Sequence, residues 1–166
     1  MNPLLDNFFN RQILAQYGPS VLAGFWVTVE VALLVIAVGV ALGLGAARFR
    51  SIEGFVDPYL SILMVTPMAA LIPLLMMSFG IEIWSRVILV IVFTIPVIIV
   101  NSLAGVRQVD ANLIEMATSF GATEREIWTK ILLLGALPPI MTGIRLGLGR
   151  GITGMVIIEL LMIAVG

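Results

Sequence analysis

Long apolar runs alternate with short polar stretches along most of the chain. Because the hydrocarbon core of a bilayer is about 30 Å thick and needs about 20 helical residues to cross it, each long run predicts a membrane span. The runs lie near residues 21–47, 55–79, 83–103 and 139–165. The second run contains Pro58, Pro67 and Pro73, so we expect it to be kinked or broken between Thr66 and Pro73. The predicted fold class is an all-α polytopic membrane protein with about four transmembrane helices.

A charged segment at residues 107–138 separates the third run from the fourth and predicts a helix-turn-helix. Four apolar residues recur there at positions i, i+3, i+4 and i+7, which is the spacing of one helix face: Leu113, Met116, Ala117 and Phe120. Gly121 follows at the point where a helix can end in the left-handed conformation, because glycine has no Cβ to clash.

A second helix is predicted to begin directly after this turn. Thr123 and Glu126 have the Thr-x-x-Glu spacing of a capping box. Glu126 and Lys130 are spaced as an i, i+4 ion pair on the wetter side of the helix. The apolar stripe of this helix is expected from Ile127, Trp128, Ile131 and Leu134.

The composition supports a membrane protein and excludes several kinds of chemistry. Apolar residues make up 60% of the chain and charged residues 11%, against roughly 45–50% and about 25% in soluble domains. A net charge of −1 gives no reason to expect a nucleic-acid partner. With no cysteine and no histidine, the sequence predicts no disulfide, no metal site and no histidine general base. We find no paired acids or activated nucleophile, so we expect no enzyme activity.

Glycine patterns in the apolar runs predict close helix packing. The stretch at residues 149–154 matches GxGxxG, but it lies inside an apolar helix rather than between a strand and a helix, so packing is favoured over nucleotide binding. GxxxG spacings, which let helices approach closely, occur at Gly39–Gly43, Gly143–Gly147 and Gly147–Gly151. A P-loop needs Lys followed by Ser or Thr, and the only lysine, Lys130, is followed by Ile131.

Basic residues predict the orientation of the spans. Arg48 and Arg50 end the first run, and Arg107, Arg125 and Lys130 lie in the charged segment. The positive-inside rule therefore places both segments in the cytoplasm and the amino terminus outside. Residues 1–20 are expected to form an extracytoplasmic segment, either a short interfacial helix that stops at Gly18-Pro19 or a frayed tail. The apolar residues of that helix would be Leu5, Phe8, Phe9, Ile13 and Leu14.

A few polar and charged residues within the runs are candidates for a substrate path. They are Thr94, Asn101, Ser102, Arg145 and Arg150. Charges at membrane depth usually face protein or water, because burying them in lipid is costly. The alternative for the two arginines is snorkelling near the cytoplasmic face or an internal ion pair.

The charged segment resembles a known motif. The run Glu115-Met116-Ala117, three residues, Gly121, nine residues, Ile131 and a further Leu133 is similar to the EAA loop of binding-protein-dependent ABC importer permeases. Met116 replaces the middle Ala of that pattern. Leu134 stands where the motif has Pro, and Pro138 with Pro139 offers a helix break instead.

The resemblance covers roughly residues 20 to 166 and points to the nitrate, sulfonate and taurine branch. It is carried by LIPLLMMSFGI at residues 71–81, NSLAGVRQVDANLIEMATSFGA at 101–122 and LPPIMTGIRLGLGRGITGMVIIEL at 137–160. It implies that residues 21–166 form a type-1 ABC permease domain in the inner cell membrane, in contact with lipid. The cargo it favours is a small anion such as a sulfonate, nitrate or taurine.

The resemblance also implies partners and coupling residues. A separate ATPase subunit would bind ATP, so the chain itself needs no cofactor. A second permease copy and an extracytoplasmic solute-binding protein would complete the importer. The residues expected to couple the chain to the ATPase are Glu115, Met116, Ala117, Gly121, Thr123, Glu126, Trp128 and Ile131.

Other readings stay open at this point. The chain could be a stand-alone channel or secondary transporter, although we see no clear inverted repeat. A membrane-embedded enzyme is the third class. Relatives in the family usually continue past the position of Leu160 with another span, so a non-functional fragment is a further alternative.

Overall fold

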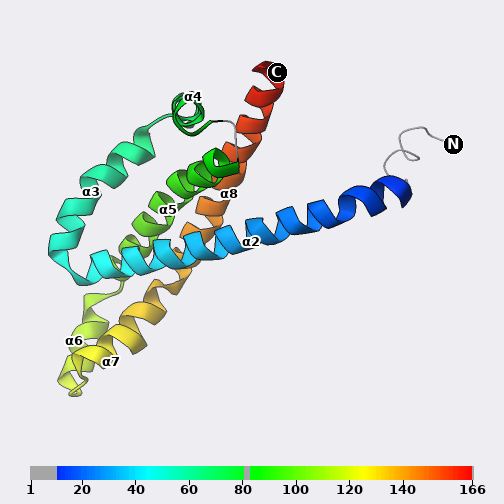
Figure 1. Cartoon of the computed structure of the whole chain (residues 1–166). Coiled ribbons are helices and arrows are strands. Elements are labelled where there is room, and N and C mark those ends of the chain that lie inside the picture. Colours follow the sequence, from blue (N-terminus) through cyan, green and yellow to red (C-terminus); the bar gives the residue numbers. More distant parts are fainter. Residues whose placement is uncertain (1–10, 81–82, 166) are drawn as a thin grey trace. The chain divides into compact units, whose positions relative to one another are not determined.

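The computed structural model describes residues 11–80 and 83–165, and every regular element in them is helical (Figure 1). This confirms the predicted all-α class. The elements are α2 (Arg11–Arg48), α3 (Arg50–Val65), α4 (Met68–Phe79), α5 (Ile83–Arg107), α6 (Ala111–Ser119), α7 (Glu124–Glu126), the π-helix η1 (Ile127–Leu132) and α8 (Leu133–Val165).

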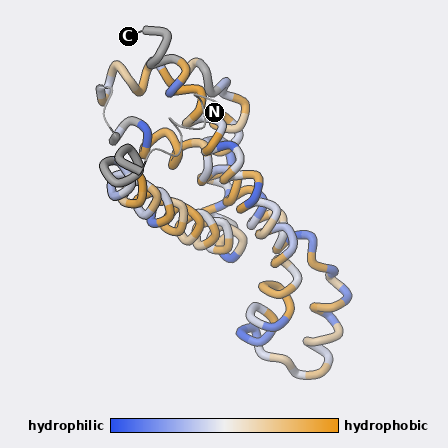
Figure 2. The backbone as a smooth tube through the Cα atoms, turned by 90° about the vertical axis from the view of Figure 1, so that its right-hand side faces the viewer, coloured by the Kyte–Doolittle hydropathy of each residue, from blue (hydrophilic) through white to orange (hydrophobic). Residues whose placement is uncertain are grey.

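Three helical stretches are long and apolar enough to cross a bilayer: Tyr17–Arg48, Arg86–Arg107 and Glu124–Leu160. Figure 2 shows apolar residues predominating along the helices and polar ones gathering around the α6–α7 turn. The helices α3 and α4 meet at a bend of 106°. If this bent pair crosses the bilayer as one broken span, the chain has a fourth span. The count therefore agrees with the prediction of about four.

The bend between α3 and α4 falls at Thr66 and Pro67. Thr66 has φ −64° and ψ 124°, and Pro67 is the N-cap of α4. A proline disfavours the helical conformation of the residue before it, which explains why α3 ends here. The predicted break between Thr66 and Pro73 is thus confirmed, while Pro73 itself lies inside α4.

Two compact units divide the chain, at residues 1–34 and 35–166. In the first, the described residues belong to α2, which runs through Pro19 without stopping. The predicted stop at Gly18-Pro19 is therefore wrong. A single proline removes one helical hydrogen bond, whereas an apolar segment in lipid needs nearly all its backbone groups bonded within the helix. Leu5, Phe8 and Phe9 of the predicted interfacial helix lie outside the described residues.

A second correction concerns Pro138 and Pro139. They lie inside α8 and do not break it, so the helix that follows the turn continues from Glu124 through η1 into the last span. Packing explains why the helix continues through the two prolines, because Gly105 of α5 lies opposite Pro139. A methyl group at Gly105 would lie 3.0 Å from the Pro139 Cβ. The glycine leaves room for the proline ring against α5.

In the second unit, glycines bring helices against α5 from two directions. On α8, Gly143, Gly147 and Gly151 face α5, and a methyl group at Gly147 would lie 3.1 Å from the Thr94 carbonyl oxygen. On the part of α2 after Val35, a methyl group at Gly43 would lie 2.9 Å from the Ile99 carbonyl oxygen. The GxxxG patterns therefore mark close helix contacts, as predicted.

Two buried apolar clusters fill the space around α5. One holds Ile72, Leu89, Phe93 and Ile158, from α4, α5 and α8. We call the other the loop-side cluster; its buried members are Val106, Leu132, Ala136 and Ile140. It lies where α5, η1 and α8 meet, and so it anchors the base of the helix-turn-helix against α5 and α8.

Candidate functional site

The helix-turn-helix predicted from the charged segment is present, with α6 and α7 beside each other at one end of the α5 and α8 pair (Figure 1). Asp110 caps α6 and accepts a hydrogen bond from the Asn112 backbone N–H at 2.9 Å. At the other end Gly121 has φ +79°, and the Ala122 N–H donates to the Ala117 carbonyl at 3.0 Å. Gly121 therefore makes the left-handed turn that the sequence predicts.

The second helix begins with the expected capping box. The Thr123 N–H donates to the Glu126 carboxylate at 3.1 Å, and the Glu126 N–H donates to the Thr123 Oγ1 at 3.4 Å. The Lys130 ammonium lies 2.9 Å from the other carboxylate oxygen of Glu126. Thr123 and Glu126 thus fix the start of the helix, and the predicted i, i+4 pair is confirmed.

The helix then widens into a π-helix over Ile127–Leu132, which the sequence did not predict. Ile127 and Trp128 turn toward the loop-side cluster and pack against it. Of the rest of the predicted stripe, Ile131 is half-buried and Leu134 is exposed. Nothing in residue spacing signals a π-helix, because it depends on where these side chains find packing partners.

The short helix α6 leaves its predicted apolar face uncovered. Phe120, which follows α6, is 86% exposed, Met116 is 54% exposed and Leu113 is 45% exposed. Ala117 is half-buried, and Ile114 on another side of the helix packs against the loop-side cluster. The apolar face is therefore free to meet another molecule, while Ile114 holds α6 in place.

Glu115 lies away from this apolar face, since its position on α6 is roughly opposite. It is exposed and borders a shallow hollow with Ile114, Thr118 and Ser119. Its backbone carbonyl accepts a hydrogen bond from the Ser119 hydroxyl at 2.9 Å. Its carboxylate forms no salt bridge among those found in the described residues.

Two ion pairs that the sequence did not reveal lie at neighbouring helix ends: one ties the helix-turn-helix to α2, and the other joins α5 to α3. Arg48, the last residue of α2, places its Nη2 2.6 Å from the Glu124 Oε1. Its guanidinium carbon also lies 5.5 Å from the centre of the Trp128 ring, within range of a cation–π interaction. Arg107 at the end of α5 pairs with Glu53 near the start of α3.

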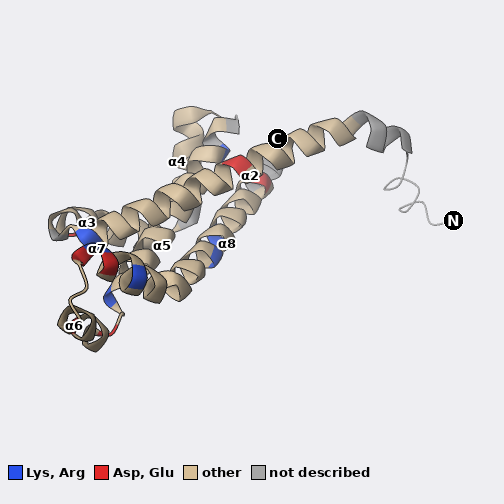
Figure 3. Cartoon of the chain, turned by 90° about the horizontal axis from the view of Figure 1, so that it is seen from below, with Lys and Arg blue, Asp and Glu red and all other residues tan. Residues whose placement is uncertain are grey.

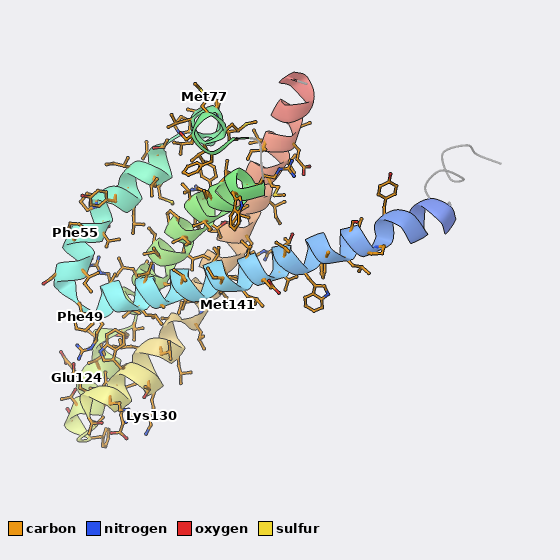
Figure 4. All side chains as sticks on the ribbon, in the orientation of Figure 1. Phe49, Phe55, Met77, Glu124, Lys130 and Met141 are labelled. Carbon is orange, nitrogen blue, oxygen red and sulfur yellow. The ribbon has the colours of Figure 1, made fainter. Side chains whose placement is uncertain are left out.

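These pairs place charge around the helix-turn-helix. Figure 3 shows acidic and basic residues gathered near α3 and α7. In Figure 4 the labelled Phe49, just after α2, lies above Glu124 and Lys130 of the helix-turn-helix. A displacement of the second helix would therefore act on the end of α2 through Arg48, and one of α5 on α3 through Arg107.

The polar residues predicted for a substrate path lie on helix contacts. Thr94 and Ser102 are fully buried in α5, and their hydroxyl oxygens have no hydrogen-bond partner among the described residues. Asn101 donates to the Val97 carbonyl at 2.8 Å, and a methyl group at Gly143 would lie 2.6 Å from its Cβ. In this arrangement the three residues serve packing, and their part in a path stays a prediction.

The two candidate arginines of α8 have different surroundings. Arg145 is exposed. Arg150 is half-buried, and its Nη1 lies 3.4 Å from the Met64 Sδ of α3. It borders a cavity of about 280 Å³ at the bend between α3 and α4. Sequence alone did not separate these residues, because that bend approaches α8 only in the folded chain.

Comparison with known proteins identifies a family that covers most of the chain. Residues 39–166 match the model of the family described as binding-protein-dependent transport system inner membrane component. The taurine transport system permease protein TauC of Escherichia coli is 35% identical over 126 residues, 76% of this chain and 44% of that protein. The glycine betaine/proline betaine permease protein ProW of Escherichia coli is 36% identical over 134 residues, 81% of this chain and 37% of that protein.

A third relative is the putative aliphatic sulfonates transport permease protein SsuC of Escherichia coli. It is 38% identical over 97 residues, 58% of this chain and 37% of that protein. The chain thus spans less than half the length of these curated relatives. The matched region contains the helix-turn-helix and both helices that flank it. On this match the chain belongs to the family of binding-protein-dependent transport system inner membrane components.

Proposed function

We propose that this chain is the transmembrane permease subunit of an ATP-driven ABC importer, coupled through its helix-turn-helix to a separate ATPase subunit. The observation that carries the proposal is the uncovered apolar face of Leu113, Met116 and Phe120 on a rigidly capped element. An exposed apolar face on a structured loop of a membrane protein is typical of a docking surface. Family membership favours an ATPase as the partner.

The proposed mechanism follows from how the loop is attached. ATP-driven closure of two ATPase subunits would move two such loops together, one from each permease copy. The continuous helix from Glu124 to Leu160 would carry that motion into the last span. The Arg48–Glu124 pair would transmit part of it to α2. The permease halves would then alternate between inward-open and outward-open states.

The proposed setting is the inner cell membrane, with the helix-turn-helix in the cytoplasm and lipid around the spans. A second permease copy would complete the path, and an extracytoplasmic solute-binding protein would deliver the solute. ATP would be bound by the ATPase subunit, so this chain would need no cofactor and hydrolyse nothing itself. A small sulfonate-like anion is the favoured solute, because the names of TauC and SsuC specify taurine and aliphatic sulfonates.

Co-purification with the cognate ATPase subunit tests the coupling. Phe120→Asp puts a charge on the exposed apolar face and should weaken the complex by at least about 10-fold, as expected for an aromatic at the centre of an interface. Asn112→Asp is the matched control, since it adds the same charge to α6 in its first turn, where an acid is tolerated. Asn112 is exposed and lies off the apolar face.

Transport gives a second readout. Gly121→Val should abolish ATP-dependent uptake while the protein still inserts in the membrane, because φ +79° is strongly disfavoured for a β-branched residue. If the native chain fails to bind the ATPase, the coupling proposal is wrong and a stand-alone channel or transporter becomes the better model. Equal binding by the Phe120 and Asn112 variants would show that the apolar face is not the docking surface.

A further inference from the structure

The cavity at the bend between α3 and α4 has two kinds of wall. One wall is the bend itself, including Met64, Thr66 and Pro67, and the other comes from α5 and α8, including Phe93 and Arg150. Its volume of about 280 Å³ is close to the lower end of the range for small-ligand sites, about 300–1,000 Å³. A small solute fits such a space, whereas a larger cofactor does not.

Arg150 is the one charged residue among the described residues that line this cavity. Its guanidinium has five N–H donors, but its side chain makes a single described hydrogen bond, to the Met64 thioether at 3.4 Å. Sulfur is a weak acceptor. None of the three salt bridges found in the described residues involves Arg150. A half-buried cation in an apolar helix therefore lacks an anionic partner among the described residues.

The surroundings favour an anion in this position. Thr66 lines the cavity, but its hydroxyl already donates to the Ile62 carbonyl at 2.7 Å, and the described lining residues include no carboxylate. Pro67, where α4 begins, lies in the wall, so the positive end of that helix dipole adds to the field of Arg150. The remaining wall is apolar, including Leu63 and Phe93.

We propose that this cavity binds a small organic oxyanion with an aliphatic tail, such as an alkyl sulfonate. Arg150 would hold the oxyanion through two parallel N–H···O bonds, the geometry that a guanidinium makes with planar or tetrahedral oxyanions. The apolar wall would hold the tail. The inference rests on the proposed function in taking the ligand to be the transported solute, and it assigns the recognition of charge to one residue of this chain.

Binding of ethanesulfonate to the full chain in nanodiscs of zwitterionic lipid tests the assignment. Arg150→Gln should raise the dissociation constant by about 10-fold or more, as expected for losing a charge-assisted hydrogen-bonded pair. Arg150→Lys keeps the charge but loses the paired N–H donors of the guanidinium, and should give an intermediate dissociation constant. Arg125→Gln removes the same charge from an exposed position in the helix-turn-helix and should leave the constant within about 2-fold of the native value.

Two further arms make the result decisive. Ethyl methyl sulfone has a shape similar to that of ethanesulfonate but carries no charge. The proposal would be overturned if the native chain bound the sulfone as tightly as ethanesulfonate. It would also be overturned if the Arg150→Gln variant bound ethanesulfonate with native affinity. Nanodiscs containing phosphatidylglycerol test a lipid headgroup as the source of the oxyanion. Competition of that lipid with ethanesulfonate for the native chain would assign the cavity to lipid and overturn the assignment to solute.

The outcome is separable from that of the coupling experiment. Ethanesulfonate binding that depends on Arg150 in a chain that does not bind the ATPase would support the cavity and refute the proposed function. A chain that binds the ATPase but whose Arg150→Gln variant binds ethanesulfonate normally would refute the cavity alone.

Discussion

Gly43 offers a sharp test of how closely α2 packs on α5, because Gly45 provides a control two residues away. A methyl group at Gly43 would lie 2.6 Å from the Ser102 Cβ and 2.9 Å from the Ile99 carbonyl oxygen. A methyl group at Gly45 would meet nothing within 4 Å. Gly43→Ala and Gly45→Ala therefore share the same chemistry and differ only in the space that receives the methyl group.

The expected size of the effect follows from these distances. The Ile99 carbonyl belongs to the backbone and cannot rotate away, so the two helices must separate by about 1 Å to restore ordinary contact. A gap of that size forfeits about a quarter to a half of each affected dispersion contact, and overpacking of this kind costs about 1–3 kcal/mol. Replacing glycine by alanine within a helix by itself stabilises the folded state by up to about 1 kcal/mol. Gly43→Ala should therefore destabilise by up to about 2 kcal/mol, and Gly45→Ala should be neutral or stabilising, so that the two variants differ by about 1–3 kcal/mol.

Unfolding in mixed micelles, followed by fluorescence of the three tryptophans, gives the free energy of unfolding of each variant. Adding Ser102→Gly to Gly43→Ala should recover part of the loss, because it removes the nearer of the two obstructing groups. If Gly43→Ala is as stable as Gly45→Ala, the close contact between α2 and α5 does not exist, and the glycine spacing has another origin.

Three further predictions concern the contacts around the helix-turn-helix and the last span. Thr123→Val removes the capping hydroxyl at constant shape and should cost about 0.5–2 kcal/mol of unfolding free energy, measured with the Thr123→Ser variant as the conservative control. A double-mutant cycle of Arg48→Ala and Glu124→Ala should give a coupling energy of about 0.2–1 kcal/mol, because both groups are largely exposed, and high salt should reduce it. Gly151→Ala, whose methyl group would lie 2.6 Å from the Thr94 hydroxyl, should lower stability, whereas Gly149→Ala, with nothing within 4 Å, should not.

Each of these has a clear contrary result. Equal stability of the Val and Ser variants at Thr123 would mean that the hydroxyl does not cap the helix. A coupling energy of zero at low salt would mean that the ion pair seen between Arg48 and Glu124 is not maintained in solution. Equal stability of the Gly149 and Gly151 variants would refute the close contact of α8 with α5.

Local sequence signals accounted for the turn and the start of the second helix. Gly121 and the Thr123–Glu126 box depend on a few adjacent residues, and the structure places them as expected. The break at Thr66 is likewise local, because the ring of Pro67 acts on its immediate predecessor. Glycine spacing also predicted the close packing, since only a missing side chain lets two helix backbones approach.

The features that the sequence did not predict depend on residues far apart in the chain. Proline rules predicted breaks at Pro19 and Pro138, but both prolines lie inside helices. At Pro19 the helix continues because an apolar segment in lipid must keep its backbone groups hydrogen-bonded. At Pro138 and Pro139 it continues because Gly105 leaves room for the proline ring. The Arg48–Glu124 pair joins two segments that only the fold brings together. Arg150 became a distinct candidate only when the bend of α3 and α4 was placed against α8.

Because the helix continues from Glu124 to Leu160, a small tilt at one end produces a large displacement at the other. Its 37 residues correspond to a rod about 55 Å long at 1.5 Å per residue. A tilt of about 5° at the end near the turn would displace the opposite end by about 5 Å, close to one helical turn. The π-helix at Ile127–Leu132 and the Pro138–Pro139 pair both interrupt the regular hydrogen bonding of this helix. The stiffness of these two stretches would then set how much of a small rotation reaches the far side of the bilayer.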